Sequence, residues 1–319
     1  MATGPAVDLL VAGVRNGDVR AMARAITLVE DGRPEARDLT AALFPHAGGA
    51  LVVGVTGPPG AGKSSLVDRL TAHLRGQGTS VGIVAVDPTS PFSGGAILGD
   101  RIRMQSHATD PGVFIRSMAT RGHLGGLAAA TDQVLTVLAA AGKEVILVET
   151  VGVGQDEVEI VGTADVSVVV LVPGLGDEVQ ALKAGIMEIA DVFVVNKADR
   201  EGVERLIAEI ESMLSLATGG DPPPAIVKTV ATRGEGIVEL IDAVLGFRRR
   251  AESSGALARK RRTQMRRQLE DAVRQRVMSR VYERVLTPGE IETIVDRLAE
   301  RTVDPITAAE EVAKRMGLP

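Results

Sequence analysis

The chain has 319 residues, enough for one α/β domain with additional segments. Its formal net charge is −5 and it has one Tyr, five Phe and no Trp, so we expect no nucleic-acid partner. It contains no Cys, which excludes disulfides, thiolate zinc sites and iron–sulfur clusters. We expect a cytoplasmic protein with no membrane partner, because no secretory signal opens the sequence and its apolar runs are short.

Residues 1–45 are predicted to be a helical N-terminal extension. Leu9, Leu10 and Val14 recur at helical spacing, and Ile26 and Leu28 continue the pattern among Ala, Arg and Glu residues. A proline at position 45 then marks a boundary before the next domain.

Residues 46–247 alternate between strand and helix patterns, which defines the second expected domain. The expected strands cover 51–56, 81–86, 145–149, 166–172, 192–196 and 226–231. They are rich in Val and Ile, and most are apolar throughout, as buried parallel strands are. Alternation of this kind predicts an α/β fold, with a doubly wound and mainly parallel sheet.

A phosphate-binding loop follows the first expected strand and opens a helix. The segment reads G-P-P-G-A-G-K-S and matches G-x-x-x-x-G-K-[ST]. Its backbone N–H groups and the helix dipole are suited to hold phosphates. Lys63 is expected to reach the β- and γ-phosphates, and the Ser64 hydroxyl to bind Mg²⁺. The expected nucleotide-binding residues here are Gly57, Pro58, Pro59, Gly60, Ala61, Gly62, Lys63, Ser64 and Ser65.

Acidic residues stand at two strand ends and after a glycine-rich loop. Asp87 ends the strand 81–86, Asp100 closes the loop 93–99, and Glu149 ends the strand that begins at 145. With Ser64 they are the expected metal ligands, and with Lys63 the expected catalytic residues, because carboxylate oxygens suit Mg²⁺. The N–H of Gly152 is expected to contact the γ-phosphate and to lose this contact after hydrolysis.

The residue that positions the attacking water is not evident from the sequence. Ras-like proteins place a Gln directly after the switch glycine, and here that position is Val153. We therefore predict slow intrinsic hydrolysis that needs a partner or a rearrangement. Other candidates for the catalytic step are Gln155, Asp156, Arg101, Arg103 and Arg121.

The segment Asn196-Lys197-Ala198-Asp199 predicts that the base is guanine. It follows the strand 192–196, at the sheet edge where ligands bind in such folds. The Asp199 carboxylate can accept hydrogen bonds from guanine N1–H and N2–H₂, and adenine has no matching donors. Asn196 and Lys197 are expected to brace the loop and cover the base. The backbone at Ala231 and Thr232 is expected to offer an N–H to the guanine oxygen.

Residues 248–319 are predicted to be a helical C-terminal arm. A stripe of apolar residues lies within 277–286, and Thr287 to Glu290 read as a capping box before a second helix. Asp304 and a following proline begin a third. Such apolar stripes need a packing partner, either the main domain or a second subunit. The basic residues of 248–284 alternate with acidic ones, which favours an ion-paired helix face over a nucleic-acid surface.

Three segments resemble one known family, the MeaB-type G proteins. Residues 87–104, D-P-T-S-P-F-S-G-G-A-I-L-G-D-R-I-R-M, resemble their first switch. Residues 149–157 resemble their second switch, with Glu where Ras-like proteins have Asp, and residues 172–183 resemble a third loop. These proteins are GTPase chaperones of methylmalonyl-CoA mutase, also labelled ArgK or LAO/AO transport ATPase. The resemblance covers nearly the whole chain.

The resemblance implies a P-loop GTPase that binds GTP or GDP with Mg²⁺ and forms a homodimer through the C-terminal arm. It implies a partner, an adenosylcobalamin-dependent methylmalonyl-CoA mutase, whose cofactor loading, protection or reactivation depends on GTP. Cobalamin would belong to that partner. Positions matching Lys63, Ser64, Asp87, Asp100 and Glu149 serve the phosphates and Mg²⁺ in that family, and those matching Asn196, Lys197 and Asp199 read guanine. The third loop, here with Asp177, Glu178, Gln180 and Lys183, communicates with the mutase.

Three alternatives remain open from the sequence. A GTPase for nickel insertion usually carries Cys or His clusters, and this chain has no Cys and four scattered His. An ATP-dependent kinase or transport-linked ATPase conflicts with the segment from Asn196 to Asp199. A nucleotide-dependent binding module without a turnover cycle shares the same chemistry, and only a partner's effect on turnover separates it from a chaperone.

Overall fold

The computed structural model describes residues 4–87, 105–107, 109–119, 126–150, 162–174, 189–216 and 222–316. The chain divides into two compact units, Met1–Gln264 and Met265–Pro319. The first unit therefore contains the N-terminal helices, the sheet and the first part of the expected arm. The sequence-based limits of three domains, 1–45, 46–247 and 248–319, rest on changes in composition, whereas the two units are defined by contacts. The three-domain division therefore stays a prediction.

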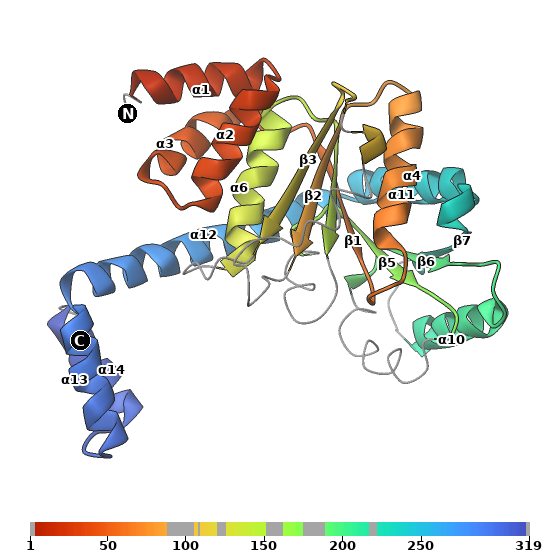
Figure 1. Cartoon of the computed structure of the whole chain (residues 1–319). Helices are drawn as coiled ribbons and strands as arrows, with labels where there is room; N and C mark the ends of the chain where they lie inside the picture. The colour runs from red at the N-terminus through yellow and green to blue at the C-terminus, as the bar shows by residue number, and fades with distance from the viewer. Residues whose placement is uncertain are drawn as a thin grey trace. The chain divides into compact units, whose positions relative to one another are not determined.

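The first unit is built on one seven-stranded sheet (Figure 1). Its strands are β1 Leu51–Thr56, β2 Val81–Asp87, β3 Val113–Ala119, β4 Val145–Thr150, β5 Val166–Leu171, β6 Val192–Asn196 and β7 Ala225–Thr229. Their order is β3-β2-β4-β1-β5-β6-β7, and all neighbours pair in parallel. The sequence-based prediction of a doubly wound parallel sheet is confirmed.

Two details of the sheet differ from the prediction. The strand β3 was not expected, because Arg116 and Ser117 interrupt its apolar pattern; among the described strands it lies at the edge of the sheet and pairs with β2 alone. The last strand stops at Thr229 rather than 231, since Ala231–Arg233 turn into a short 3-10 helix, η3.

Helices cover both faces of the sheet (Figure 1). One face holds α4 Lys63–Gly76 and α11 Ile237–Ser253; the other holds α1 Pro5–Arg15, α2 Val19–Glu30, α3 Pro34–Leu43, α6 Gly126–Ala140 and, over β5 and β6, α10 Val203–Leu216. The alternation of strand side chains produces this arrangement, because neighbours point to opposite faces. In β4, Val145 and Leu147 pack with α4 and α11, whereas Ile146 and Val148 pack with the N-terminal helices and α6.

The N-terminal helices are joined to the sheet by apolar packing and by one ion pair. Val14, Ile26 and Leu39 are fully buried in the cluster that α6 shares. Arg116 of β3 pairs with the Glu30 carboxylate, which is largely buried on α2. A charged strand residue is therefore retained at the sheet edge because it has a partner on a neighbouring helix.

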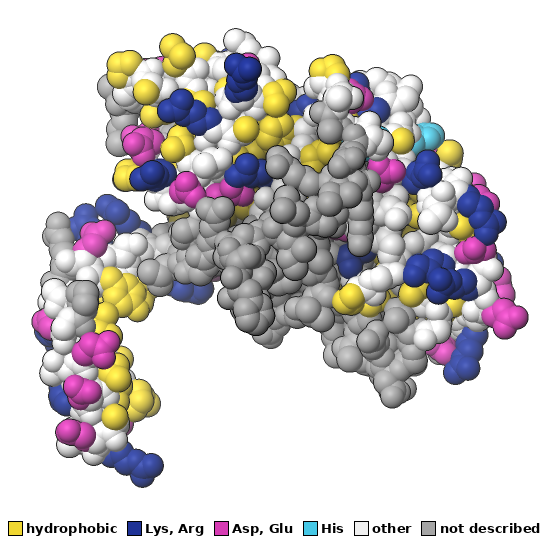
Figure 2. Space-filling view, viewed as in Figure 1, with side chains coloured by type: hydrophobic (Ala, Val, Ile, Leu, Met, Phe, Trp, Pro, Cys, Tyr) yellow, Lys and Arg dark blue, Asp and Glu magenta, His cyan; other side chains and the backbone are white. Residues whose placement is uncertain are grey.

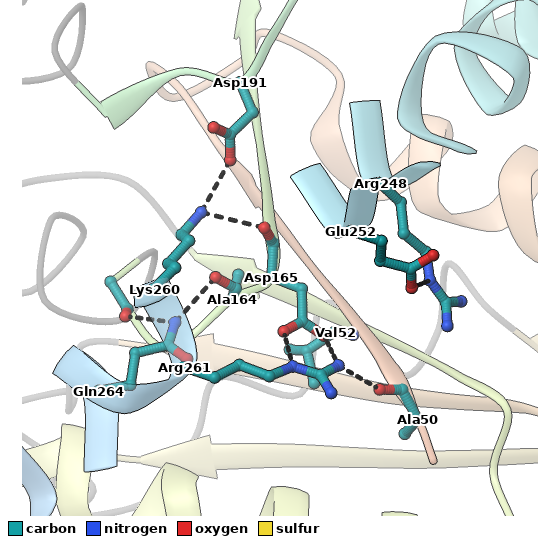
Figure 3. A network of polar contacts seen from close by, with 11 residues as sticks. Ala50, Val52, Ala164, Asp165, Asp191, Arg248, Glu252, Lys260, Arg261 and Gln264 are labelled. Carbon is teal, nitrogen blue, oxygen red and sulfur yellow. Dashed lines mark hydrogen bonds and ion pairs between the residues drawn. The ribbon is translucent and has the colours of Figure 1, made fainter. Parts of the chain in front are cut away.

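The sheet end opposite the phosphate loop carries a network around Asp165, the residue before β5 (Figure 3). Its carboxylate, 5% exposed, accepts the Val52 N–H at 3.0 Å and two bonds from Arg261, at 2.7 and 2.8 Å. The hydrogen bond to Asp165 raises the pKa of the Arg261 guanidinium above its usual value. Two parallel bonds of this kind fix both the orientation of the guanidinium and its distance from the carboxylate.

Neighbouring residues of α12, Ala256–Arg284, extend this network. Lys260 donates to Asp191 at 2.8 Å and to the Asp165 carbonyl at 3.0 Å. The amide of Gln264 donates to the carbonyls of Gly162 and Ala164, each at 3.0 Å. The start of α12 is thus bound to the turn that leads into β5.

The second unit contains the rest of α12 with α13 Pro288–Ala299 and α14 Pro305–Arg315. The predicted capping box is confirmed: both the N–H and the hydroxyl of Thr287 donate to Glu290, at 2.9 and 2.8 Å. Asp304 caps α14 through the N–H groups of Ile306 and Thr307. Hydrophobic side chains are exposed on this unit (Figure 2). The large ones among the described residues are Met265, Leu269, Val273, Val277, Tyr282, Val295 and Ile306.

Acid should weaken the second unit through Glu290. The N–H and hydroxyl of Thr287, and then Arg315, lower the Glu290 pKa from 4.5 to about 2. Because the pKa is lower in the folded state, the stabilisation is complete above pH 4.5 and is lost as pH falls through about 2. Tyr282 is the sole Tyr in a chain without Trp, so its fluorescence reports on this unit during unfolding.

We expect Glu290→Gln to lower the stability of this unit at neutral pH. The variant should then lose less stability than the wild type as pH falls from 4.5 to about 2. Asp304 and Glu311 also have lowered pKa values, so in this variant they still make stability depend on pH. Glu310→Gln, on the exposed side of α14, is the matched control. If stability depended on pH in the same way in Glu290→Gln and Glu310→Gln, Glu290 would not be a source of the acid sensitivity.

Candidate nucleotide-binding site

The glycine loop leaves the carboxyl end of β1, which lies between β4 and β5. Gly57 has φ 140°, and a Cβ there would collide with the Val170 carbonyl of β5. Gly62 has φ 90°, and a Cβ there would collide with the Asn196 amide. Glycine is required at both positions because the loop has a left-handed backbone and presses against two neighbouring strands.

Lys63 is the first residue of α4, and its ammonium group folds back over the glycine loop. It is buried and donates to the carbonyls of Gly57 at 2.6 Å and Pro58 at 3.1 Å. A buried ammonium is retained only when it has partners such as these. The positive charge is therefore held directly above the loop whose N–H groups suit phosphate.

Ser64 and Glu149 meet next to the loop. The Ser64 hydroxyl donates to Glu149 Oε1 at 2.6 Å, and both side chains are buried. The next residue, Thr150, donates its hydroxyl to that of Thr56, at the end of β1, at 3.0 Å. One hydroxyl and one carboxylate fit Mg²⁺, which takes few protein oxygens and completes its shell with phosphates and water.

Several predicted residues lie outside the described part of the chain. They are Asp100, Gly152, Asp177, Glu178, Gln180 and Lys183, together with Gln155, Asp156, Arg101, Arg103 and Arg121. Asp87 ends β2, as expected, but its side chain is also outside the description. Within the described ranges no group of three or more His, Asp or Glu side chains gathers around a common point.

Asn196 and Lys197 join the end of β6 to the phosphate loop. The buried Asn196 amide donates to the Ala61 carbonyl at 2.7 Å, and its oxygen accepts from Thr229 at 3.0 Å and from the Ala231 N–H at 3.1 Å. Lys197 has φ 57° and donates to the Gly60 carbonyl at 2.7 Å. The Ala231 N–H, expected to face guanine, is bonded to Asn196 in this structure.

Asp199 lies beside η3 and forms an ion pair with Arg233 at 2.6 Å. The backbone of η3 is also held by Arg69 of α4, which donates to the carbonyls of Ala231 at 3.2 Å and Thr232 at 3.1 Å. The sequence did not indicate either arginine. Arg69 is 162 residues from Ala231, and no motif records a contact between such distant segments.

Residues 22–285 match the family model described as methylmalonyl Co-A mutase-associated GTPase MeaB. The chain belongs to the MeaB family of GTPases. The resemblance noted in the two switch segments and the third loop is thereby confirmed at the level of the family.

Individual relatives agree with membership of the MeaB family. A protein of Pyrococcus abyssi is 51% identical over 316 residues, which cover 97% of each chain. The GTPase ArgK of Escherichia coli is 36% identical over 273 residues, 82% of each chain. A crystal structure described as LAO/AO transport system kinase superposes with a TM-score of 0.73 at 25% identity, covering 99% of each chain. No helix in the described part of the chain is long and apolar enough to cross a membrane.

Asn196→Ala should damage both the fold and the site of this MeaB-family protein. The change leaves the Ala61 carbonyl and the Ala231 N–H without this partner, so we expect a loss of about 3 kcal/mol of unfolding free energy. GDP affinity should fall by roughly tenfold or more, since two loops lose their common support. Urea unfolding and GDP titration measure the two effects.

Asn196→Asp is the matched variant, because its carboxylate keeps the acceptors for Thr229 and Ala231 but cannot donate to Ala61. We expect its unfolding free energy and its GDP affinity to lie between those of the wild type and of Asn196→Ala. An alanine variant as stable as the wild type would contradict the bracing role.

Proposed function

We propose that this protein is a GTP-hydrolysing chaperone of an adenosylcobalamin-dependent methylmalonyl-CoA mutase. It binds GTP at the edge formed by the ends of β1, β4 and β6, and it uses hydrolysis to gate the mutase's cofactor loading, protection or reactivation. The observation that carries this proposal is the match of residues 22–285 to a family described as mutase-associated GTPases. The bonds between the phosphate loop and the segment from Asn196 to Asp199 support it.

The chain's own residues divide the work of binding. Lys63 exchanges its loop carbonyls for the β- and γ-phosphates, which are charged and stronger acceptors. Asp199 accepts from guanine N1–H and N2–H₂. Asn196 keeps the phosphate loop and the loop after β7 at a fixed separation, so that both ends of the nucleotide are engaged together.

Ser64 and Glu149 are the described residues that would hold Mg²⁺, with Asp87 and Asp100 as further proposed ligands. Bound there, the ion would neutralise charge on the transferring phosphoryl group. Glu149 accepts a bond from Ser64 at 2.6 Å, which orients the hydroxyl that ends the phosphate loop.

The proposed assembly is a homodimer through the C-terminal arm. Met265, Leu269, Val273 and Val277 recur every four residues on α12, and each is exposed. Residues three and four apart lie on one side of a helix, so these side chains form an apolar strip suited to a second copy. The proposed contact with the mutase is the third loop, with Asp177, Glu178, Gln180 and Lys183, and the proposed location is the cytoplasm.

Steady-state GTP hydrolysis with and without the same organism's methylmalonyl-CoA mutase tests the proposal. We expect slow turnover of GTP alone, acceleration by the mutase, and no turnover of ATP. Lys63→Ala should abolish GTP binding and serves as the site-specific control.

Each other outcome contradicts a different part of the proposal. GTP turnover that the mutase does not change would leave the proposed nucleotide site intact and would contradict the mutase as the partner. GTP-dependent mutase binding without turnover would indicate a binding module instead of a cycling chaperone. Turnover of ATP would overturn the base assignment.

Asp199→Asn should shift the nucleotide preference from GTP toward xanthosine triphosphate. The amide presents a donor where guanine N1–H needs an acceptor, and xanthine has a carbonyl in place of the 2-amino group. Competition between the two triphosphates for the variant and the wild type measures the shift. Unchanged selectivity would remove Asp199 from the base site.

A further inference from the structure

Arg233 binds the carboxylate proposed to read the base, although neither side chain is buried. Its Nη2 lies 2.6 Å from Asp199 Oδ2, and the side chains of Arg233 and Asp199 are 56% and 39% exposed. An exposed ion pair contributes little to stability, because water screens it. Such a pair can instead set the orientation of a side chain. The charged donor fixes how the plane of the carboxylate is turned.

The same carboxylate has room for both Arg233 and guanine. Two carboxylate oxygens provide about four acceptor sites, and guanine N1–H and N2–H₂ require two of them. Arg233 takes one site on Oδ2 and is itself approached by Glu235 at 3.5 Å. Pairing with Arg233 therefore leaves enough acceptors for the base.

The position of Arg233 depends in turn on Arg69. One guanidinium binds the two carbonyls that directly precede Arg233, those of Ala231 and Thr232, at 3.2 and 3.1 Å. Arg69 lies on α4, the helix that begins at Lys63. The phosphate-binding helix thus holds the backbone from which Arg233 reaches Asp199.

We infer that Arg69 and Arg233 are positioning residues for guanine recognition, acting through the η3 backbone and the Asp199 carboxylate. Arg233 turns the carboxylate toward N1–H and N2–H₂, and Arg69 keeps Arg233 within reach. The inference rests on the proposed guanine site and adds two residues that its motif does not contain. It predicts that selectivity for the base is set partly from the helix that binds the phosphates.

Binding of GDP and of IDP to the full-length protein tests this inference. IDP lacks the 2-amino group, so the ratio of the two dissociation constants reports on the contact between Asp199 and N2–H₂. We expect Arg233→Ala and Arg69→Ala each to weaken GDP binding about three- to tenfold and to weaken IDP binding less, which lowers the ratio. Arg233→Lys should restore part of the ratio, because an ammonium group can still reach the carboxylate.

Arg205→Ala is the matched control. Arg205 also forms an exposed ion pair, at 3.1 Å with Glu209 on its own helix α10. We expect it to bind GDP and IDP as the wild type does. Thermal melting without nucleotide is measured for every variant, and Arg69→Lys replaces Arg69→Ala if the alanine variant does not fold.

The outcomes separate the inference from the proposed function. A wild type that prefers GDP over IDP, with arginine variants that match Arg205→Ala, would overturn the inference alone. Tighter GDP binding by Arg233→Ala would also overturn it, because the ion pair would then compete with guanine. A wild type without preference between GDP and IDP would overturn the guanine site itself, and the inference with it.

Discussion

The buried amide of Asn196 is the contact on which the arrangement of the site depends. One side chain donates to the phosphate loop at Ala61 and accepts from Thr229 and from the Ala231 N–H, so it fixes three segments at once. A buried amide with unmet bonds is costly, which confines these segments to one arrangement. Gly62 completes the constraint, because any side chain there would displace the amide. The phosphate loop and the segment proposed to recognise the base are therefore already linked in this structure.

This linkage has a mechanical basis in the sheet. The ends of β1, β4 and β6 are held in register by parallel pairing, so the side chains that leave these ends have little freedom to separate. Ser64 and Glu149 meet because the glycine loop joins the end of β1 to the start of α4, and β4 is the neighbour of β1. Arg69 adds a second connection, from the helix to the loop after β7. The site is accordingly a property of the strand order rather than of any single loop.

Local patterns in the sequence predicted most of the fold and the segments that come together at the candidate site. The glycine loop, the segment from Asn196 to Asp199 and the cap at Thr287 are each contained in a few consecutive residues, so their geometry follows from chain stereochemistry. The edge strand β3 was missed because Arg116 and Ser117 break its apolar run, and the partners of the Arg116 guanidinium, Glu30 and Thr27, lie far away in the sequence on α2. Arg69 and Arg233 were missed because their partners are brought close only by the completed sheet. The end of the first compact unit at Gln264 likewise follows from the contacts of α12 with Asp165, which composition does not reveal.

The network around Asp165 also orders the events of biosynthesis. Arg261 donates to the Ala50 carbonyl, 211 positions earlier in the chain, and provides two of the bonds to the Asp165 carboxylate. Before the α12 residues are synthesised, this carboxylate has only the Val52 N–H among these partners, and Asp165 directly precedes β5, a strand in which Ser167 is the one polar residue. Contacts between such distant positions form slowly, because a long loop has to close. The bonds between Arg261 and Asp165 therefore form only after α12 has been synthesised, so this end of the sheet is consolidated late.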